Sequence, residues 1–133
     1  MIDASTTRDR DDAITVTPTT TGWEVAVFVA NVADLVPAGS SADRTAATRV
    51  ETRYRARGTT PMLGAQLEQA ATLSATRDRD AVAVRLRVSA DGDTTLTGIS
   101  REVLAAGSCA ALSHADVTTI LDDPDHAHHA QLT

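Results

Sequence analysis

The segment Ala13-Ile14-Thr15-Val16-Thr17, followed after a short connection by Trp23-Glu24-Val25-Ala26-Val27-Phe28-Val29-Ala30, decides the fold of this chain. The first segment alternates apolar and polar residues, as a half-buried strand does, and the second is rich in residues that favour β-structure. Only the turn-like stretch from Pro18 to Gly22 separates them. We therefore expect an antiparallel hairpin at the start of a sheet.

A second hairpin is expected further along the chain. Val82 to Val88 alternates cleanly, Asp91-Gly92 is a turn signal, and Thr94 to Ile99 returns. Three helices are also predicted: one over 43–49, capped by Ser40 or Ser41 and running toward Tyr54, one over 65–71, and one over 117–121 behind a capping box of Ser113 and Asp116. The order of elements predicts an α+β fold with mixed or antiparallel hairpins and short helices.

The composition is that of one globular domain. Its 133 residues are 42% hydrophobic and 23% charged, and no apolar run approaches the ~20 residues that a membrane helix needs. No basic and apolar leader follows Met1, so we expect a cytoplasmic protein with no membrane partner. All twelve basic residues are arginine and the net charge is −6, which argues against binding nucleic acid through general electrostatics. Contact with RNA would require a local basic groove or metal ions.

Two minor features favour structural explanations. Cys109, the single cysteine, is expected to be a small buried residue rather than a nucleophile. The terminal histidines His126, His128 and His129 lie beside Asp125, and we favour a polar tail over 122–133 to a metal site, because ligands must be held by a fold.

Four carboxylates crowd the beginning of the chain: Asp3, Asp9, Asp11 and Asp12. Such a run is either a solvated surface or a set of hard oxygen ligands for Mg²⁺ or Mn²⁺. Carboxylates that hold two ions ~3.5–4 Å apart form a site for phosphodiester hydrolysis. A calcium loop counted from Asp9 is excluded, because Ala13 and Ile14 occupy the positions of a ligand and of the required glycine.

The residues around this cluster resemble the start of the RNB catalytic domain of the ribonuclease II and ribonuclease R family. The resemblance rests first on Ile2-Asp3, Asp9-x-Asp11-Asp12-Ala13 and Gly22-Trp23-x-Val25-x-Val27. Further similar segments follow in the same order: Val29-Ala30-Asn31-Val32, the stretch from Val36 to Arg49, Tyr54 ahead of Pro61-Met62-Leu63, Arg79-Asp80-Ala81, the Asp91-Gly92 hairpin, and the stretch from Ala111 to Val117. The similarity implies that residues 1–121 are the N-terminal portion of an RNB-like exoribonuclease domain.

The same resemblance implies a function and a set of site residues. It implies 3′ to 5′ hydrolysis of single-stranded RNA to nucleoside 5′-monophosphates, with Mg²⁺, or Mn²⁺ in its place, bound by the four aspartates. Asp3 and Asp12 are implied as direct ligands and Asp9 as support, while loss of Asp11 should impair catalysis most. Tyr54 would stack on a base near the 3′ end. The alternative for Tyr54 is a tyrosine at a helix end, packed on the core.

Departures from the family pattern leave a second hypothesis open. Asn31 stands where the family has aspartate, Gly64 where it has proline, and His114 where it has tyrosine. The later part of the catalytic domain, with arginines that clamp the phosphate, and the flanking RNA-binding β-barrels are absent from these 133 residues. The alternative is a truncated, non-catalytic RNB remnant, or one part of a split enzyme that binds metal or the remainder of the domain.

Arg53, Arg55 and Arg57 alternate around Tyr54. In an extended segment their guanidinium groups would share one face. They either line an RNA path or form a solvated edge, and the sequence does not separate these two interpretations.

Overall fold

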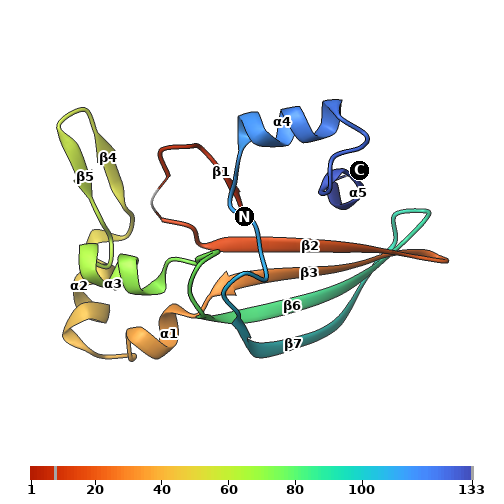
Figure 1. Ribbon diagram of the computed structural model, residues 1–133. Helices are drawn as coiled ribbons and strands as arrows, with labels where there is room; N and C mark the ends of the chain where they lie inside the picture. The colour runs from red at the N-terminus through yellow and green to blue at the C-terminus, as the bar shows by residue number, and fades with distance from the viewer. Residues whose placement is uncertain (8, 133) are drawn as a thin grey trace.

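A computed structural model describes residues 1–7 and 9–132, without the side chains of 130 and 131. Its main sheet is antiparallel, with the strand order β2-β3-β6-β7 (Figure 1). The strands are β2 (Asp12–Thr19), β3 (Gly22–Ala30), β6 (Arg79–Ser89) and β7 (Thr94–Leu104). Both predicted hairpins are present, and with the helices they confirm the α+β fold.

The turn of the first hairpin is shorter than the sequence suggested. Pro18 belongs to β2, where it pairs with Trp23, and only Thr20 and Thr21 connect the strands. β2 is an edge strand of the sheet, so the missing N–H group of proline removes no ladder hydrogen bond. The prediction of a turn beginning at Pro18 was therefore wrong.

Five short helices and two small sheets complete the described part of the chain. The helices are α1 (Val32–Leu35), α2 (Ser41–Arg49), α3 (Ala65–Ala71), α4 (His114–Asp122) and α5 (His129–Leu132). A parallel pair joins β1 (Ile2–Asp3) to β8 (Leu112–Ser113), and an antiparallel pair joins β4 (Arg53–Arg55) to β5 (Gly58–Thr60). Figure 1 shows α1, α2, α3 and the β4–β5 hairpin gathered at one end of the main sheet.

Two of the three predicted helices begin with an N-terminal cap that the sequence predicted. The Ser40 hydroxyl accepts a hydrogen bond from the Asp43 N–H at 3.1 Å, and Ser113 and Asp116 form the expected capping box. The prediction that the first helix runs toward Tyr54 was wrong, because α2 ends at Arg49 and Val50 takes a φ of 69°. Val50 and Thr52 are β-branched residues, which disfavour a longer helix.

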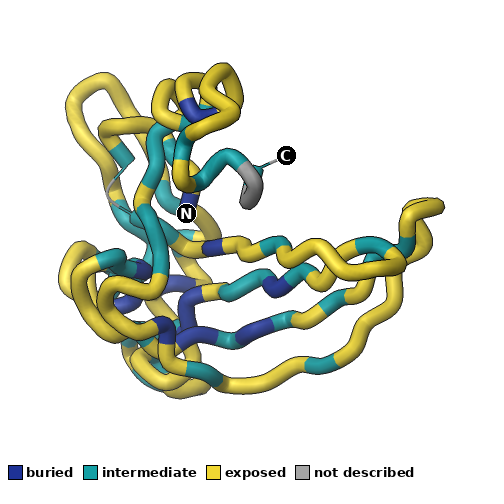
Figure 2. Tube along the Cα trace, turned by 45° about the vertical axis from the view of Figure 1, so that its right-hand side comes forward, coloured by how far each residue is buried: buried dark blue, intermediate teal, exposed yellow. Residues whose placement is uncertain are grey.

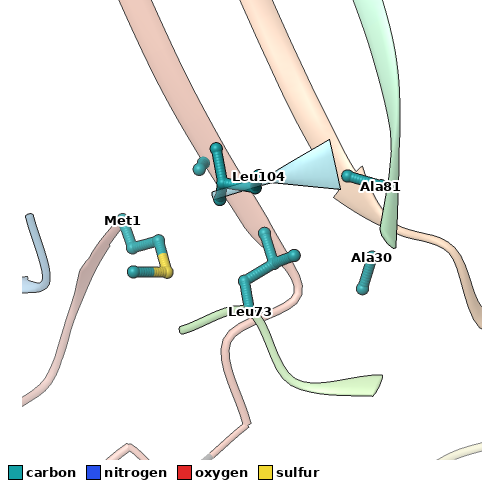
Figure 3. Close-up of a cluster of buried hydrophobic side chains, with 6 residues drawn as sticks. Met1, Ala30, Leu73, Ala81 and Leu104 are labelled. Carbon is teal, nitrogen blue, oxygen red and sulfur yellow. The ribbon is translucent and has the colours of Figure 1, made fainter. Parts of the chain in front are cut away.

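The core lies at the end of the sheet where β3 leads into α1, and the turns at the opposite end are exposed (Figure 2). Half of its buried cluster is alanine, and the six residues are Met1, Ala13, Ala30, Leu73, Ala81 and Leu104. Leu73 has no exposed surface and lies between Met1 and Ala30 (Figure 3). Cys109 packs against this cluster and is partly buried, in agreement with a structural role.

The C-terminal segment contains more regular structure than a polar tail. α4 extends to Asp122, and α5 contacts both α4 and β2. The boundary between residues 121 and 122 remains a prediction. No helix in the described part of the chain is long and apolar enough to cross a membrane.

Gly22 is predicted to be essential for the first hairpin. Its φ is 145°, and an added Cβ atom would lie 2.0 Å from the Val88 carbonyl oxygen. We expect Gly22→Ala to lower the free energy of unfolding by about 2 kcal/mol or more, because both the backbone strain and the clash are unavoidable. Chemical denaturation measures this change.

Gly98→Ala is the matched control, because Gly98 also lies in the main sheet but nothing comes within 4 Å of its added Cβ. The control should be neutral or slightly stabilising. Equal stabilities for the two variants would contradict the assigned geometry of Gly22.

Candidate active site

The acidic loop, residues 3–12, connects β1 to β2 and is fixed on both sides. On the β1 side, the Met1 carbonyl accepts a hydrogen bond from the Leu112 N–H at 3.0 Å, and Asp3 pairs with Ser113. On the β2 side, the Leu73 N–H donates to the Arg10 carbonyl at 2.8 Å. The Ala30 N–H donates to the Asp11 carbonyl, also at 2.8 Å. Because Leu73 and Ala30 belong to the core, folding determines where the loop lies.

Three aspartates of the acidic loop act electrostatically on the fourth, Asp11. The pKa of Asp11 is raised above its ordinary value of 3.8, first because neighbouring atoms partly desolvate its carboxyl group, although the residue as a whole is exposed. Repulsion by the charges of Asp9, Asp12 and Asp3 raises this pKa further. The structure therefore places the carboxylates of Asp3, Asp9 and Asp12 close enough to Asp11 to act on its charge.

One cation within the loop offsets this negative charge. The Arg10 Nε atom lies 4.0 Å from the Asp3 Oδ2 atom, and both side chains are partly exposed. At that distance and exposure the ion pair contributes little to stability. Arg8, the other basic residue of the loop, lies outside the described residues. The described part of the loop thus keeps an excess of negative charge.

The chemistry of the donor set fits a divalent metal ion. Carboxylate oxygens are the ligands that Mg²⁺ and Mn²⁺ prefer, and a cation would relieve the repulsion that raises the pKa of Asp11. Within residues 1–7 and 9–132, however, no three histidine, cysteine, aspartate or glutamate side chains are spaced to hold one ion as they stand. Ion binding would therefore have to draw the carboxylates closer together.

A cleft of about 1040 Å³ lies beside the acidic loop. Its lining residues come from the loop (Thr6, Thr7, Asp9, Arg10), the hairpin and its exit (Tyr54, Thr59, Pro61), and α3 (Ala65, Glu68, Gln69, Thr72). Asp9 and Tyr54 thus share one cleft, whereas the other three aspartates are not among its lining residues. The interpretation of Tyr54 as a core residue at a helix end was wrong, since Tyr54 lies in β4 and is 74% exposed.

Side-chain contacts attach the β4–β5 hairpin to its neighbours. Arg49 at the end of α2 donates from Nη1 to the carbonyl of Pro61 at 2.9 Å and to that of Met62 at 3.2 Å. The Thr52 hydroxyl donates to Glu68 of α3 at 3.1 Å and accepts from the Met62 N–H at 3.0 Å. Sequence reasoning missed these residues as supports of Tyr54, because their partners are backbone groups and a helix distant in sequence.

The three departures from the family pattern have separate structural surroundings. Asn31 is buried and donates from Nδ2 to Asp34 at 2.6 Å. Gly64, just before α3, has a φ of 93°, which a proline cannot adopt, so this departure changes how the chain enters α3. His114 is the exposed first residue of α4.

The raised pKa of Asp11 has a consequence for stability. A carboxyl group whose pKa is raised by folding favours the folded state when protonated, and this contribution is lost as the pH rises through the folded-state pKa. In EDTA at neutral pH, Asp11→Asn should therefore raise the melting temperature slightly, because solvent screens a carboxylate that is this exposed. The difference should narrow as the pH falls toward 3.8.

Asp91→Asn, in the β6–β7 turn, removes one carboxylate outside the cluster and serves as the control in these melting curves. An Asp11→Asn variant that melts below the wild type at neutral pH would show that the carboxylate is not under repulsion.

Comparison with known proteins places the chain in a family. The RNB domain family model matches residues 1–133. DIS3-like exonuclease 2 of Xenopus tropicalis is 32% identical over 126 residues, which cover 93% of this chain and 15% of that protein.

Two solved structures share the fold. Mycoplasma genitalium RNase R in complex with ribose methylated single-stranded RNA superposes with a TM-score of 0.84 at 24% identity, over 94% of this chain and 19% of that one. Yeast Ssd1, described as a pseudonuclease, superposes with a TM-score of 0.70 at 16% identity, over 90% of this chain and 15% of that one. The chain thus spans less than a fifth of the length of each of these proteins. It belongs to the RNB domain family.

Proposed function

We propose that this chain contributes the metal site of a 3′ to 5′ exoribonuclease that hydrolyses single-stranded RNA to nucleoside 5′-monophosphates. The observation that carries the proposal is the acidic loop, in which three aspartates act on the charge of Asp11 and one of them, Asp9, lines a cleft that also contains Tyr54. The exonuclease named among its relatives, and the RNase R structure with single-stranded RNA, support the same activity. We place this function in the cytoplasm and in residues 1–121, the N-terminal portion of the domain.

Each aspartate has a proposed role at the site. Mg²⁺, or Mn²⁺ in its place, would activate a water molecule and stabilise the oxygen that leaves phosphorus. Asp3 and Asp12, at the two ends of the loop, are proposed as direct ligands, and Asp9 supports the site from the wall of the cleft. Asp11 is proposed, from the resemblance to the family, as the aspartate whose loss impairs catalysis most.

Tyr54 is proposed to hold the RNA by stacking on a base near the 3′ end. Its ring is exposed on a hairpin that Arg49, Thr52 and Glu68 attach to the helices, and it shares a cleft with Asp9. Stacking of a base on an aromatic ring contributes ~1–3 kcal/mol and tolerates any sequence. The cleft would therefore direct an unpaired 3′ end toward the acidic loop.

A second candidate function is binding without turnover. The fold is shared with yeast Ssd1, which is described as a pseudonuclease, and the aspartates are not spaced to hold an ion as they stand in the described residues. In this alternative the chain is a non-catalytic remnant or one part of a split enzyme. It would bind metal or the remainder of an RNB domain without degrading RNA.

An exonuclease assay separates the two functions. With Mg²⁺ present, single-stranded RNA labelled at its 5′ end should shorten from its 3′ end, and chromatography should detect nucleoside 5′-monophosphates. Asp11→Asn should reduce the rate by about 100-fold or more, as expected when one electrostatic stabiliser is removed from an active site.

Asp91→Asn is the matched control and should leave the rate unchanged, because it removes a carboxylate from the distant β6–β7 turn. If the folded wild-type chain releases no mononucleotides in Mg²⁺ or Mn²⁺, the exonuclease proposal fails for this chain.

A further inference from the structure

The arginines without partners are concentrated on one element of the described chain. Arg8 lies outside the described residues, and seven of the other eleven arginines contact a carboxylate or a backbone carbonyl. The remaining four, whose side chains make no hydrogen bond or ion pair that the structure shows with another described residue, are Arg53, Arg55, Arg57 and Arg77. Three of these four belong to the β4–β5 hairpin.

The β4–β5 hairpin is a local exception to the charge of the protein. The chain carries a net charge of −6, but the stretch from Thr52 to Leu67 contains three arginines and no acidic residue. The side chains of Arg53, Arg55 and Arg57 are all exposed. An isolated cationic surface on an acidic protein is suited to an anionic partner, which the rest of the surface would repel.

Strand geometry separates the charged groups from the aromatic ring. Residues two apart on a strand share a face, so Arg53 and Arg55 lie on one face of β4 and Tyr54 on the other. Tyr54 lines the cleft that also contains Asp9, while Arg57 lies in the turn that follows β4. An RNA strand whose base stacks on Tyr54 would have to continue past the turn that carries Arg57 to reach the face of β4 that carries Arg53 and Arg55.

The arginines are also carried on a supported element. The hydrogen bonds of Arg49 to Pro61 and Met62, and of Thr52 to Glu68, attach the base of the hairpin to α2 and α3. A ligand that binds such a hairpin does not have to order it first, which lowers the cost of binding. A simple solvated edge would not require this support.

We propose that the β4–β5 hairpin binds the sugar-phosphate backbone of single-stranded RNA, through Arg53, Arg55 and Arg57, on the 5′ side of the nucleotide stacked on Tyr54. The inference rests on the proposed function for the identity of the ligand and for the direction of the strand. The 3′ end points to the acidic loop, so the phosphates that contact the hairpin belong to the upstream part of the RNA. The arginines offset the repulsion between this polyanion and the acidic chain.

The test is the salt dependence of binding, measured by fluorescence anisotropy with labelled single-stranded RNA in EDTA, where no metal-dependent turnover occurs. Each phosphate contact contributes about 0.7 to the slope of log affinity against log salt concentration. The triple variant Arg53→Gln/Arg55→Gln/Arg57→Gln should therefore reduce the slope by about 2. Between about 50 and 200 mM salt, the wild type should lose about 20-fold more affinity than this variant.

Two control variants separate specific contacts from net charge. Arg44→Gln/Arg77→Gln/Arg87→Gln removes the same charge from exposed positions elsewhere and should keep the wild-type slope. Tyr54→Ala should weaken binding by about 5- to 150-fold while leaving the slope unchanged, since stacking releases no counterions. Melting curves confirm that each variant folds.

If the two triple variants have equal slopes of log affinity against log salt concentration, the inference is overturned. This holds even if the wild type shortens RNA and the proposed exonuclease function stands. Absence of RNA binding by the wild type would also overturn it. An acidic peptide is also tested as a competitor of the labelled RNA. If it displaces the RNA as efficiently as unlabelled RNA does, and this displacement is lost in the triple hairpin variant, the hairpin binds a protein partner and the inference is overturned. The RNA-shortening assay independently decides the proposed function.

Discussion

Two backbone hydrogen bonds, from Leu73 to the Arg10 carbonyl and from Ala30 to the Asp11 carbonyl, fix the acidic loop to the core. Desolvation and the charges of Asp9, Asp12 and Asp3 together raise the pKa of Asp11, so the charged carboxylates do not by themselves hold the loop together. Burial of Leu73 among Met1, Ala30, Ala81 and Leu104 supplies the favourable free energy that offsets this repulsion. The acidic loop is thus attached to the buried core.

The small side chains of the core explain how this attachment is possible. Ala13, Ala30 and Ala81 are buried beside Leu73, and the chain has only three aromatic residues in all. A core of this kind allows backbones to approach closely enough for the two hydrogen bonds at 2.8 Å. The acidic loop, α3 and the β4–β5 hairpin can then surround one cleft.

The sequence predicted those parts of the fold whose signals are local. Alternation over many residues identified both hairpins of the main sheet, and serine followed by aspartate identified the caps of α2 and α4. The parallel pair β1–β8 could not be predicted, because two-residue strands show no periodicity and Ile2 pairs with Leu112 from the other end of the chain. The β4–β5 hairpin was missed for a similar reason, since its strands contain three residues each.

The candidate site was likewise predictable where neighbouring residues in the sequence define it, and not where tertiary contacts do. The proximity of Asp9, Asp11 and Asp12 follows from their adjacency in the sequence, whereas the inclusion of Asp3 depends on the fold of β1. The environment of Tyr54 was not predictable, because the contacts of Arg49 and Glu68 that support its hairpin are tertiary. Likewise, the sequence shows alternating arginines but not which of them lack a partner.

Binding of Mn²⁺, followed by the loss of the free-ion signal in electron paramagnetic resonance, tests most directly whether folding gathers the aspartates into a metal site. The account predicts that the folded wild-type chain binds Mn²⁺, and that Asp3→Asn and Asp12→Asn each weaken binding by about tenfold or more, while Asp91→Asn does not. The account would be contradicted if the wild-type chain left the free Mn²⁺ signal undiminished, or if all the variants bound Mn²⁺ equally well.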